Sequence, residues 1–222
     1  MNYLKKDNIF LIFILFYFFW VSSFQATDNH WSARIDQDIF LIYNSLLIYA
    51  GFEQDYIDHP AFSTIFILGG IYKILSFFFS NFTLTEIINS EDIDQNFQKL
   101  FSIARFLNSI YFFVYTLLLF KILKEFNINR SLRFLGILLL LTFHSLYEAL
   151  FLIRSEVLSI IFALLSFYLL IKFVKYKKSS LYCFFSGFFI CLAILAKVQV
   201  IFFIFFLILI FPFLFSYFNY QF

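Results

Sequence analysis

Long uninterrupted apolar runs are the feature that most constrains how this chain folds. A membrane-spanning helix needs about 20 predominantly apolar residues, with a range of about 17–25. Runs near that length follow one another along the chain, and the charged residues lie mainly between them. The runs are Ile9–Phe24, Ala61–Phe79, Ile103–Phe120, Phe134–Ile153, Val157–Val174, Leu181–Ala196 and Val198–Phe218. The pattern predicts an all-α fold, a polytopic transmembrane helical bundle.

Composition excludes the other common classes of protein. The sequence is 63% apolar and 14% charged, whereas a soluble domain has about 45–50% apolar and about 25% charged residues. A disordered chain would combine low hydrophobicity with high net charge, and a porin-type barrel would alternate apolar and polar residues. The net charge is only +2, and no basic run is interleaved with aromatics as a nucleic-acid surface requires. Membrane lipid is the expected partner, and nucleic acid is not.

Clusters of Lys and Arg predict the orientation, because they collect at the cytoplasmic ends of membrane spans. Basic clusters precede the first run and fill the stretches 121–133 and 172–178, whereas the stretches 25–60 and 80–98 are acidic. Placing the basic clusters inside predicts a single transmembrane domain over 1–222 with about six spans. Residues from about 25 to 102 then form a first outer loop, with juxtamembrane helices at 36–50 and 61–79. If the run Ala61–Phe79 spans the membrane instead, all later helices invert.

The predicted topology brings several ionisable residues to the outer ends of the helices. Such residues at a membrane are costly and mark binding or transport sites. Asp36 and Asp38 open the first surface helix. Asp36 suits the N-cap of this helix, Asp38 suits its first turn, and Gly51 suits the position just after its C-terminus. Alternatively, one carboxylate acts as a general base and the second shares a proton or holds a cation.

The other candidates also have two interpretations each. Asp58 and His59 precede Pro60, where they suit a helix entry or a contact to a phosphate or sugar. Arg154 and Glu156 suit a local ion pair at a helix start, although Arg is also the residue type for bidentate phosphate binding. Lys197 lies between two apolar runs, where it suits snorkelling to the interface or a contact to phosphate. The histidines are too dispersed to predict a metal site, and Cys183 and Cys191 are too far apart along one helix to pair.

The order of these residues resembles the N-terminal module of GT-C-fold glycosyltransferases, near the dolichyl-phosphate-mannose–protein mannosyltransferase and aminoarabinose-transferase type. Two matches depart from the usual family pattern. Its Asp-Glu pair appears here as Asp36-Gln37 followed by Asp38, and its Lys-Pro-Pro entry appears as His59-Pro60-Ala61. The matching elements are Arg34-Ile35-Asp36-Gln37-Asp38, Gly51, Asp58-His59-Pro60, Arg154-Ser155-Glu156, and Gly187 through Leu195 to Lys197.

The resemblance implies an inverting transfer of a sugar from a polyprenyl-phosphate donor to a hydroxyl of a glycan, lipid or protein. It places the reaction on the outer face of the membrane. In a bacterial inner membrane this is the periplasmic face. It implies Asp36 or Asp38 as the catalytic base, and it is compatible with a divalent cation between them without requiring one. It implies substrate-binding roles for Arg34, Asp58, His59, Arg154, Glu156 and Lys197.

Two other functions remain open from the sequence. Family members are considerably longer, so the chain is expected to lack their C-terminal part. That difference suits a non-catalytic or truncated membrane protein of the same fold. A small transporter would need broken helices or an inverted repeat, and only Gly69-Gly70 and Pro212 interrupt the apolar runs in that way.

Overall fold

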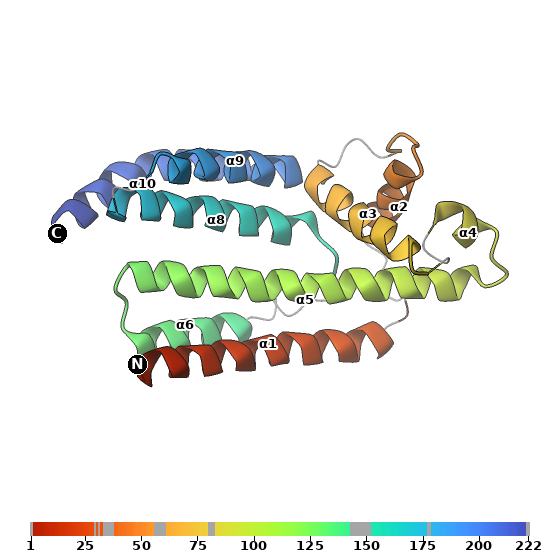
Figure 1. Cartoon of the computed structure of the whole chain (residues 1–222), viewed down its shortest axis with the longest axis horizontal. Helices are drawn as coiled ribbons and strands as arrows, with labels where there is room; N and C mark the ends of the chain where they lie inside the picture. The colour runs from red at the N-terminus through yellow and green to blue at the C-terminus, as the bar shows by residue number, and fades with distance from the viewer. Residues whose placement is uncertain are drawn as a thin grey trace. The chain divides into compact units, whose positions relative to one another are not determined.

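The computed structural model describes residues 2–28, 30, 32, 38–55, 61–79, 83–142, 152–176 and 179–220. These residues form helices and no strand, which confirms the all-α prediction (Figure 1). The chain divides into two compact units, which are described separately. Unit 1 comprises Met1–Phe113 with Thr142–Arg154, and unit 2 comprises Val114–Leu141 with Ser155–Phe222.

Among the residues that the structure describes, three helices are long and apolar enough to cross a membrane: Ile93–Glu125, Ser155–Tyr176 and Val198–Phe218. The first is longer than the predicted run Ile103–Phe120. The more polar segments 93–102 before that run and 121–125 after it belong to the same helix. These helices indicate a membrane protein.

Unit 1 contains the helix of the predicted first span and those of the predicted first outer loop. The first is α1 (Asn2–Asp28), and the others are α2 (Asp38–Tyr49), α3 (Phe62–Ser76), α4 (Leu84–Ile88) and the first part of α5 (Ile93–Glu125). The predicted helices at 36–50 and 61–79 correspond to α2 and α3, although residues 36 and 37 lie outside the described part. The short α4 was not predicted. Its N-cap is Thr83, whose side chain accepts a hydrogen bond from the Glu86 amide.

The ends of α2 and α3 follow from local chemistry. Gly51 has a φ of +83°, the left-handed conformation in which glycine ends a helix. The Phe52 amide donates to the Leu47 carbonyl at 3.0 Å, and the Gly51 amide donates to Ile48 at 3.2 Å. The expected role of Gly51 is therefore confirmed. Helix α3 has 15 residues, about 22 Å at 1.5 Å per residue, which is shorter than a hydrocarbon core of about 30 Å.

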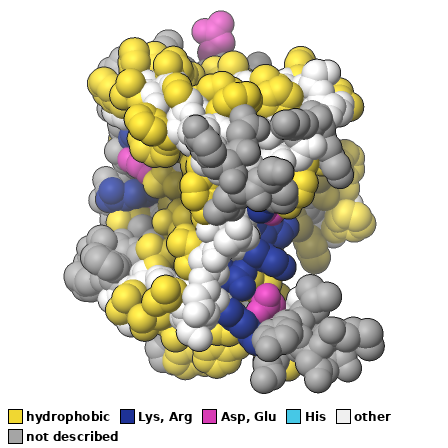
Figure 2. Space-filling view, turned by 90° about the vertical axis from the view of Figure 1, so that its left-hand side faces the viewer, with side chains coloured by type: hydrophobic (Ala, Val, Ile, Leu, Met, Phe, Trp, Pro, Cys, Tyr) yellow, Lys and Arg dark blue, Asp and Glu magenta, His cyan; other side chains and the backbone are white. Residues whose placement is uncertain are grey.

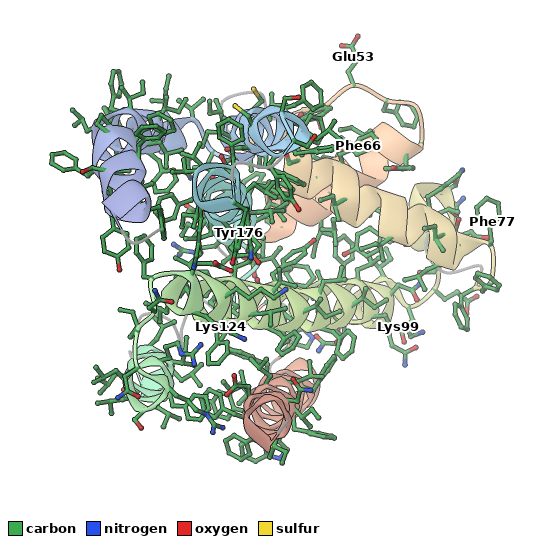
Figure 3. All side chains as sticks on the ribbon, turned by 60° about the vertical axis from the view of Figure 1, so that its left-hand side comes forward. Glu53, Phe66, Phe77, Lys99, Lys124 and Tyr176 are labelled. Atoms are coloured by element: carbon green, nitrogen blue, oxygen red, sulfur yellow. The ribbon has the colours of Figure 1, made fainter. Side chains whose placement is uncertain are left out.

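The core of unit 1 joins α2, α3 and α5. Tyr72 of α3 is fully buried, and its hydroxyl donates to the Leu100 carbonyl of α5 at 3.0 Å. Burial, with a smaller contribution from Tyr111, raises the pKa of Tyr72 well above its usual value, so the hydroxyl stays a donor. At the rim of the unit, Glu53 and Phe77 point away from the helices (Figure 3). The buried apolar residues of this core are Leu41, Ile42, Leu46, Ala61, Ile65, Leu68, Tyr72, Ile87, Leu100, Phe101, Ala104 and Ile153.

Gly69 allows α2 and α3 to approach closely. A Cβ atom at this position would lie 2.6 Å from Cε2 of Tyr49 and 2.7 Å from the backbone oxygen of Ser45. The Tyr49 ring thus occupies the space that a side chain would fill. The glycine pair is a packing contact between two helices.

Replacing Gly69 with Ala is expected to destabilise the protein by about 1–3 kcal/mol, because an overpacked contact with backbone cannot relax freely. Thermal unfolding in detergent measures this as a lowered midpoint. The matched control is Gly136→Ala in α6, where an added Cβ would meet nothing within 4 Å. That change should be neutral or slightly stabilising, because alanine is the better helix former. Equal midpoints for the two variants would contradict the close contact.

Unit 2 contains the remaining helices. After the end of α5 come α6 (Arg130–Thr142), α8 (Ser155–Tyr176), α9 (Leu181–Ala196), a single 3₁₀ turn η3 (Val198–Val200) and α10 (Ile201–Tyr220). The predicted run Phe134–Ile153 overlaps α6, and its residues 143–151 lie outside the described part. Helix α9 has 16 residues, about 24 Å in length.

Helix α8 is the centre of unit 2, with α9 and α10 packed against it. Its core contains Phe167, Ile171 and Val174 of α8, with Leu214 and Phe218 of α10 and Ile122 of α5. The outer surface of α10 is apolar, with Phe202, Leu209 and Phe213 each at least 70% exposed. Such a continuous apolar face suits lipid as the surrounding solvent.

Candidate functional site

Glu156 and Lys197 meet where α8 begins and α9 ends. The Lys197 ammonium donates to Glu156 Oε1 at 2.8 Å. The side chain of Lys197 is 12% exposed and that of Glu156 is 35% exposed. Each charge also suits its helix end, because a carboxylate is favourable at an N-terminus and an ammonium at a C-terminus. Two of the predicted substrate-binding residues are thus brought together.

Serine contacts between α8 and α9 hold this pair in register. Ser159 of α8 donates to the Ala193 carbonyl of α9 at 2.9 Å. Two turns further along, the hydroxyls of Ser166 and Ser186 lie 3.0 Å apart. Small side chains that hydrogen-bond across helices allow close packing in a membrane. The antiparallel hairpin that results places residue 197 next to residue 156.

Asp38 and Arg154 are the other predicted site residues that the structure describes, and both belong to unit 1. Asp38 is the first residue of α2 and is fully buried, at 0% exposure. Its position suits the helix dipole, whereas burial of a carboxylate is costly and demands compensation. Arg154 is half-buried just before α8.

The remaining predicted site residues, Arg34, Asp36, Asp58 and His59, lie outside the described residues, so their roles stay predictions. The same holds for a cation between Asp36 and Asp38. Within the described ranges, no group of three or more His, Cys, Asp or Glu side chains lies close enough to bind a metal.

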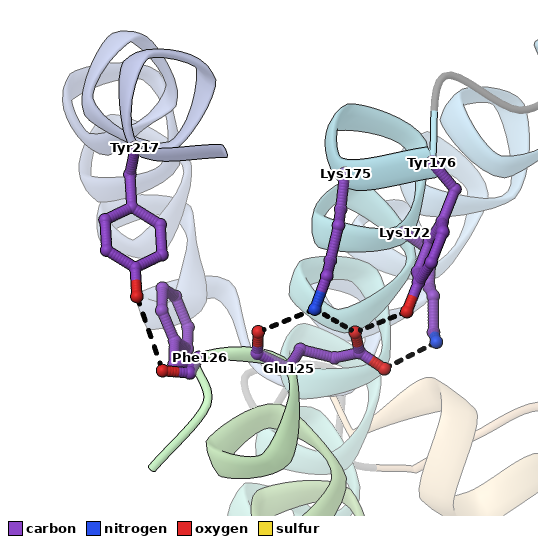
Figure 4. Close-up of polar contacts among 6 residues, drawn as sticks. All are labelled: Glu125, Phe126, Lys172, Lys175, Tyr176 and Tyr217. Atoms are coloured by element: carbon purple, nitrogen blue, oxygen red, sulfur yellow. Dashed lines mark hydrogen bonds and ion pairs between the residues drawn. The ribbon is translucent and has the colours of Figure 1, made fainter. Parts of the chain in front are cut away.

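A second polar cluster surrounds Glu125 at the end of α5, and sequence reasoning missed it. Lys172 and Lys175 both donate to the Glu125 carboxylate, Lys175 at 3.2 Å, and Lys175 also donates to the Glu125 carbonyl at 3.0 Å. The Tyr176 hydroxyl donates to the same carboxylate at 3.1 Å (Figure 4). We call Glu125, Lys172, Lys175 and Tyr176 the Glu125 cluster.

One sequence feature could have indicated the Glu125 cluster. Glu125 is the only acidic residue between positions 95 and 147, and basic residues surround it in the sequence. The contacts join two basic stretches at one end of unit 2. Charge-based threading predicts the same arrangement, with 121–133 and 172–178 on one side.

The two polar clusters stand at opposite ends of α8. Glu156 lies in its first turn, and Lys172 and Lys175 lie near its last. At 1.5 Å per residue, these positions are about 24–28 Å apart along the helix axis. That distance is close to the thickness of a hydrocarbon core, about 30 Å. The apolar part of α8 is therefore bracketed by charge at both ends.

Comparison with models of known protein families, with curated proteins and with solved structures finds no match for this chain. The functional argument therefore depends on the hydrogen-bonding capacity of the Glu156–Lys197 pair. An ammonium has three donors, and Glu156 accepts from Lys197 through one carboxylate oxygen. Lys197 can therefore contact an anion while Glu156 holds it in place.

Proposed function

We propose that this chain is a membrane glycosyltransferase of the GT-C type, with about six spans. It transfers a sugar from a polyprenyl-phosphate donor to an acceptor hydroxyl at the membrane surface. The observation that carries the proposal is the Glu156–Lys197 pair, which lies at the end of α8 away from the Glu125 cluster. By the positive-inside rule the end with the Glu125 cluster is cytoplasmic, so Lys197 faces the outer side. In a bacterial inner membrane that side is the periplasm.

The proposed reaction is an inverting displacement at the anomeric carbon. The carboxylate of Asp36 or Asp38 takes the proton of the acceptor hydroxyl, whose oxygen forms the new bond to the sugar. The bond between the anomeric carbon and the phosphate oxygen breaks, and its electrons leave with polyprenyl phosphate. A general base of this kind contributes about 10²–10⁴-fold to a rate.

Cationic side chains stabilise the leaving phosphate, where negative charge develops. We assign this role to Lys197 and Arg154, with Arg34 and His59 as further candidates and Asp58 as a donor-binding residue. Glu156 acts through Lys197 and is a positioning residue. Aromatic side chains of the bundle suit the prenyl tail of the donor, and the acceptor is a glycan, lipid or protein.

A specific observation favours a second function, that of a non-catalytic membrane protein with the same fold. Glu156 already balances the charge of Lys197, as it would if the pair only fastened α9 to α8. The two functions differ in what the loss of Lys197 does to turnover.

Replacing Lys197 with Gln is expected to slow transfer by about 10–100-fold, since a charge-assisted hydrogen bond is worth about 1.5–3 kcal/mol. The assay supplies radiolabelled polyprenyl-phosphate sugars to the purified chain in nanodiscs and measures released polyprenyl phosphate. The control is Lys73→Gln, which removes an exposed lysine of α3 and should leave the rate unchanged. A folded wild-type protein that turns over no donor in the panel would favour the non-catalytic function.

A further inference from the structure

Two arginines and two phenylalanines form a continuous stack at the start of α6. The guanidinium carbon of Arg130 lies 4.8 Å from the ring centre of Phe134. The Phe134 ring stacks on Phe120 at 5.8 Å with an angle of 19° between the planes. Arg133 lies over the other ring, 4.9 Å from the centre of Phe120. Stacking of this kind holds a guanidinium plane in a fixed orientation.

The guanidinium of Arg133 is buried without a counter-charge among the residues described. The residue is 8% exposed, and its Nε and Nη1 atoms are shielded from solvent with no hydrogen-bond partner among the residues described. A desolvated charge without a counter-charge is strongly unfavourable. Glu125 is the only acidic residue in the segment 114–141, and its carboxylate already accepts from Lys172, Lys175 and Tyr176. The nearby protein carboxylate is therefore engaged elsewhere.

The surroundings of the stack suit a phosphate. Lys121 and Lys124 of α5 are exposed beside it in the sequence. Lys and Arg side chains, with Asp or Glu side chains beside some of them, are visible on the face drawn in Figure 2. The Ser131 amide at the start of α6 already donates to Asn129 Oδ1 at 3.3 Å, so the contribution of this helix end is its dipole, which favours a phosphate group. A planar guanidinium matches phosphate oxygens better than an ammonium does. Basic clusters next to a span end also attract anionic lipids.

The exposed leucines on α6 favour a lipid over a soluble anion as the ligand. Leu132, Leu135 and Leu139 are each more than half exposed, and 135 and 139 lie one turn apart on one face of the helix. An acyl chain can lie along these leucines while its headgroup reaches the basic end. A free phosphate ion would leave them uncovered.

We propose that the start of α6 binds the phosphate of an anionic phospholipid headgroup, with Arg133 as the central ligand and the leucines of α6 against an acyl chain. The site lies in unit 2 at the end of the Glu125 cluster and does not depend on the proposed transferase activity. Arg130 adds a second guanidinium, and the dipole of α6 favours the negative charge.

The test measures lipid retention by the purified full chain in detergent, using native mass spectrometry after exchange into phosphatidylglycerol and phosphatidylcholine. Wild type should retain phosphatidylglycerol preferentially, and inorganic phosphate should not displace it. Arg133→Gln should lower that preference about tenfold, as the loss of one charge-assisted contact predicts. Lys99→Gln is the matched control, because it removes the same charge from an exposed side chain of α5 outside the basic stretch 121–133 and should change the preference little.

Two results would overturn the site. Equal retention of the two lipids by wild type, or displacement by inorganic phosphate, would remove the headgroup as the ligand. Equal effects of Arg133→Gln and Lys99→Gln would show a diffuse surface attraction instead of a site. If Arg133→Gln fails to fold, Arg133→Lys provides the second variant. It keeps the charge but loses the planar fork, and it should still lower the preference relative to wild type.

Discussion

The double variant Asp36→Asn/Asp38→Asn is expected to transfer sugar about 10²–10⁴-fold more slowly than wild type, because an amide cannot accept the proton of the acceptor hydroxyl. Asparagine keeps the size of aspartate and its ability to accept a hydrogen bond. Release of polyprenyl phosphate from a labelled donor measures the rate. Single variants then identify the base, because the variant that loses the base should match the double variant.

The matched control is Glu91→Gln, which neutralises an exposed carboxylate in the segment before α5. Because Asp38 is fully buried, Asp38→Asn could also reduce activity through stability. Retention of the donor lipid by the variant separates these causes, since a folded protein without its base still binds donor. Undiminished turnover in both single variants and in the double variant would remove the carboxylates from the mechanism.

Replacing Glu125 with Gln is expected to destabilise the protein by about 3 kcal/mol. The side chain of Glu125 is 11% exposed and that of Lys175 is 8% exposed, so the substitution leaves two lysines near each other without their carboxylate. Breaking a buried ion pair from one side typically costs about 3–5 kcal/mol. Lys172 keeps 23% of its side chain exposed, which places the effect at the lower end of that range. The midpoint of thermal unfolding in detergent gives the measurement.

A triple variant separates the ionic effect from simple loss of packing. Adding Lys172→Met and Lys175→Met to Glu125→Gln removes the two unpaired charges, so part of the lost stability should return. Lys124→Gln, one residue away but exposed, should have little effect alone. If Glu125→Gln unfolds at the same midpoint as wild type, the Glu125 cluster contributes nothing to stability.

Local chemistry made parts of the fold predictable from sequence. The apolar runs predicted helices, Gly51 predicted the end of α2, and the spacing of Cys183 and Cys191 predicted that they do not pair. Both cysteines are free and exposed on α9. These features depend on residues within one or two turns of each other, where helix geometry alone decides the outcome.

Contacts between distant residues were not predictable in the same way. Glu125 pairs with lysines 47 and 50 residues later, and no local spacing indicates that choice. Gly69-Gly70 suggested an interruption within a helix, whereas Tyr49 of another helix packs against both glycines. At the candidate site, the binding roles of Glu156 and Lys197 stay predictions, and their pairing with each other across 41 residues was not predicted.

The charged ends of α8 make unit 2 sensitive to the thickness of the bilayer around it. Glu156 and the lysines of the Glu125 cluster lie about 24–28 Å apart along the helix. Moving either charged group into the hydrocarbon core costs free energy. Helix α9 has only 16 residues, about 24 Å, and tilting would shorten its reach across a membrane further. A thicker bilayer must therefore thin locally around the α8–α9 hairpin, at a cost that grows with each ångström of mismatch. The hairpin would thus favour thin membranes over thick ones.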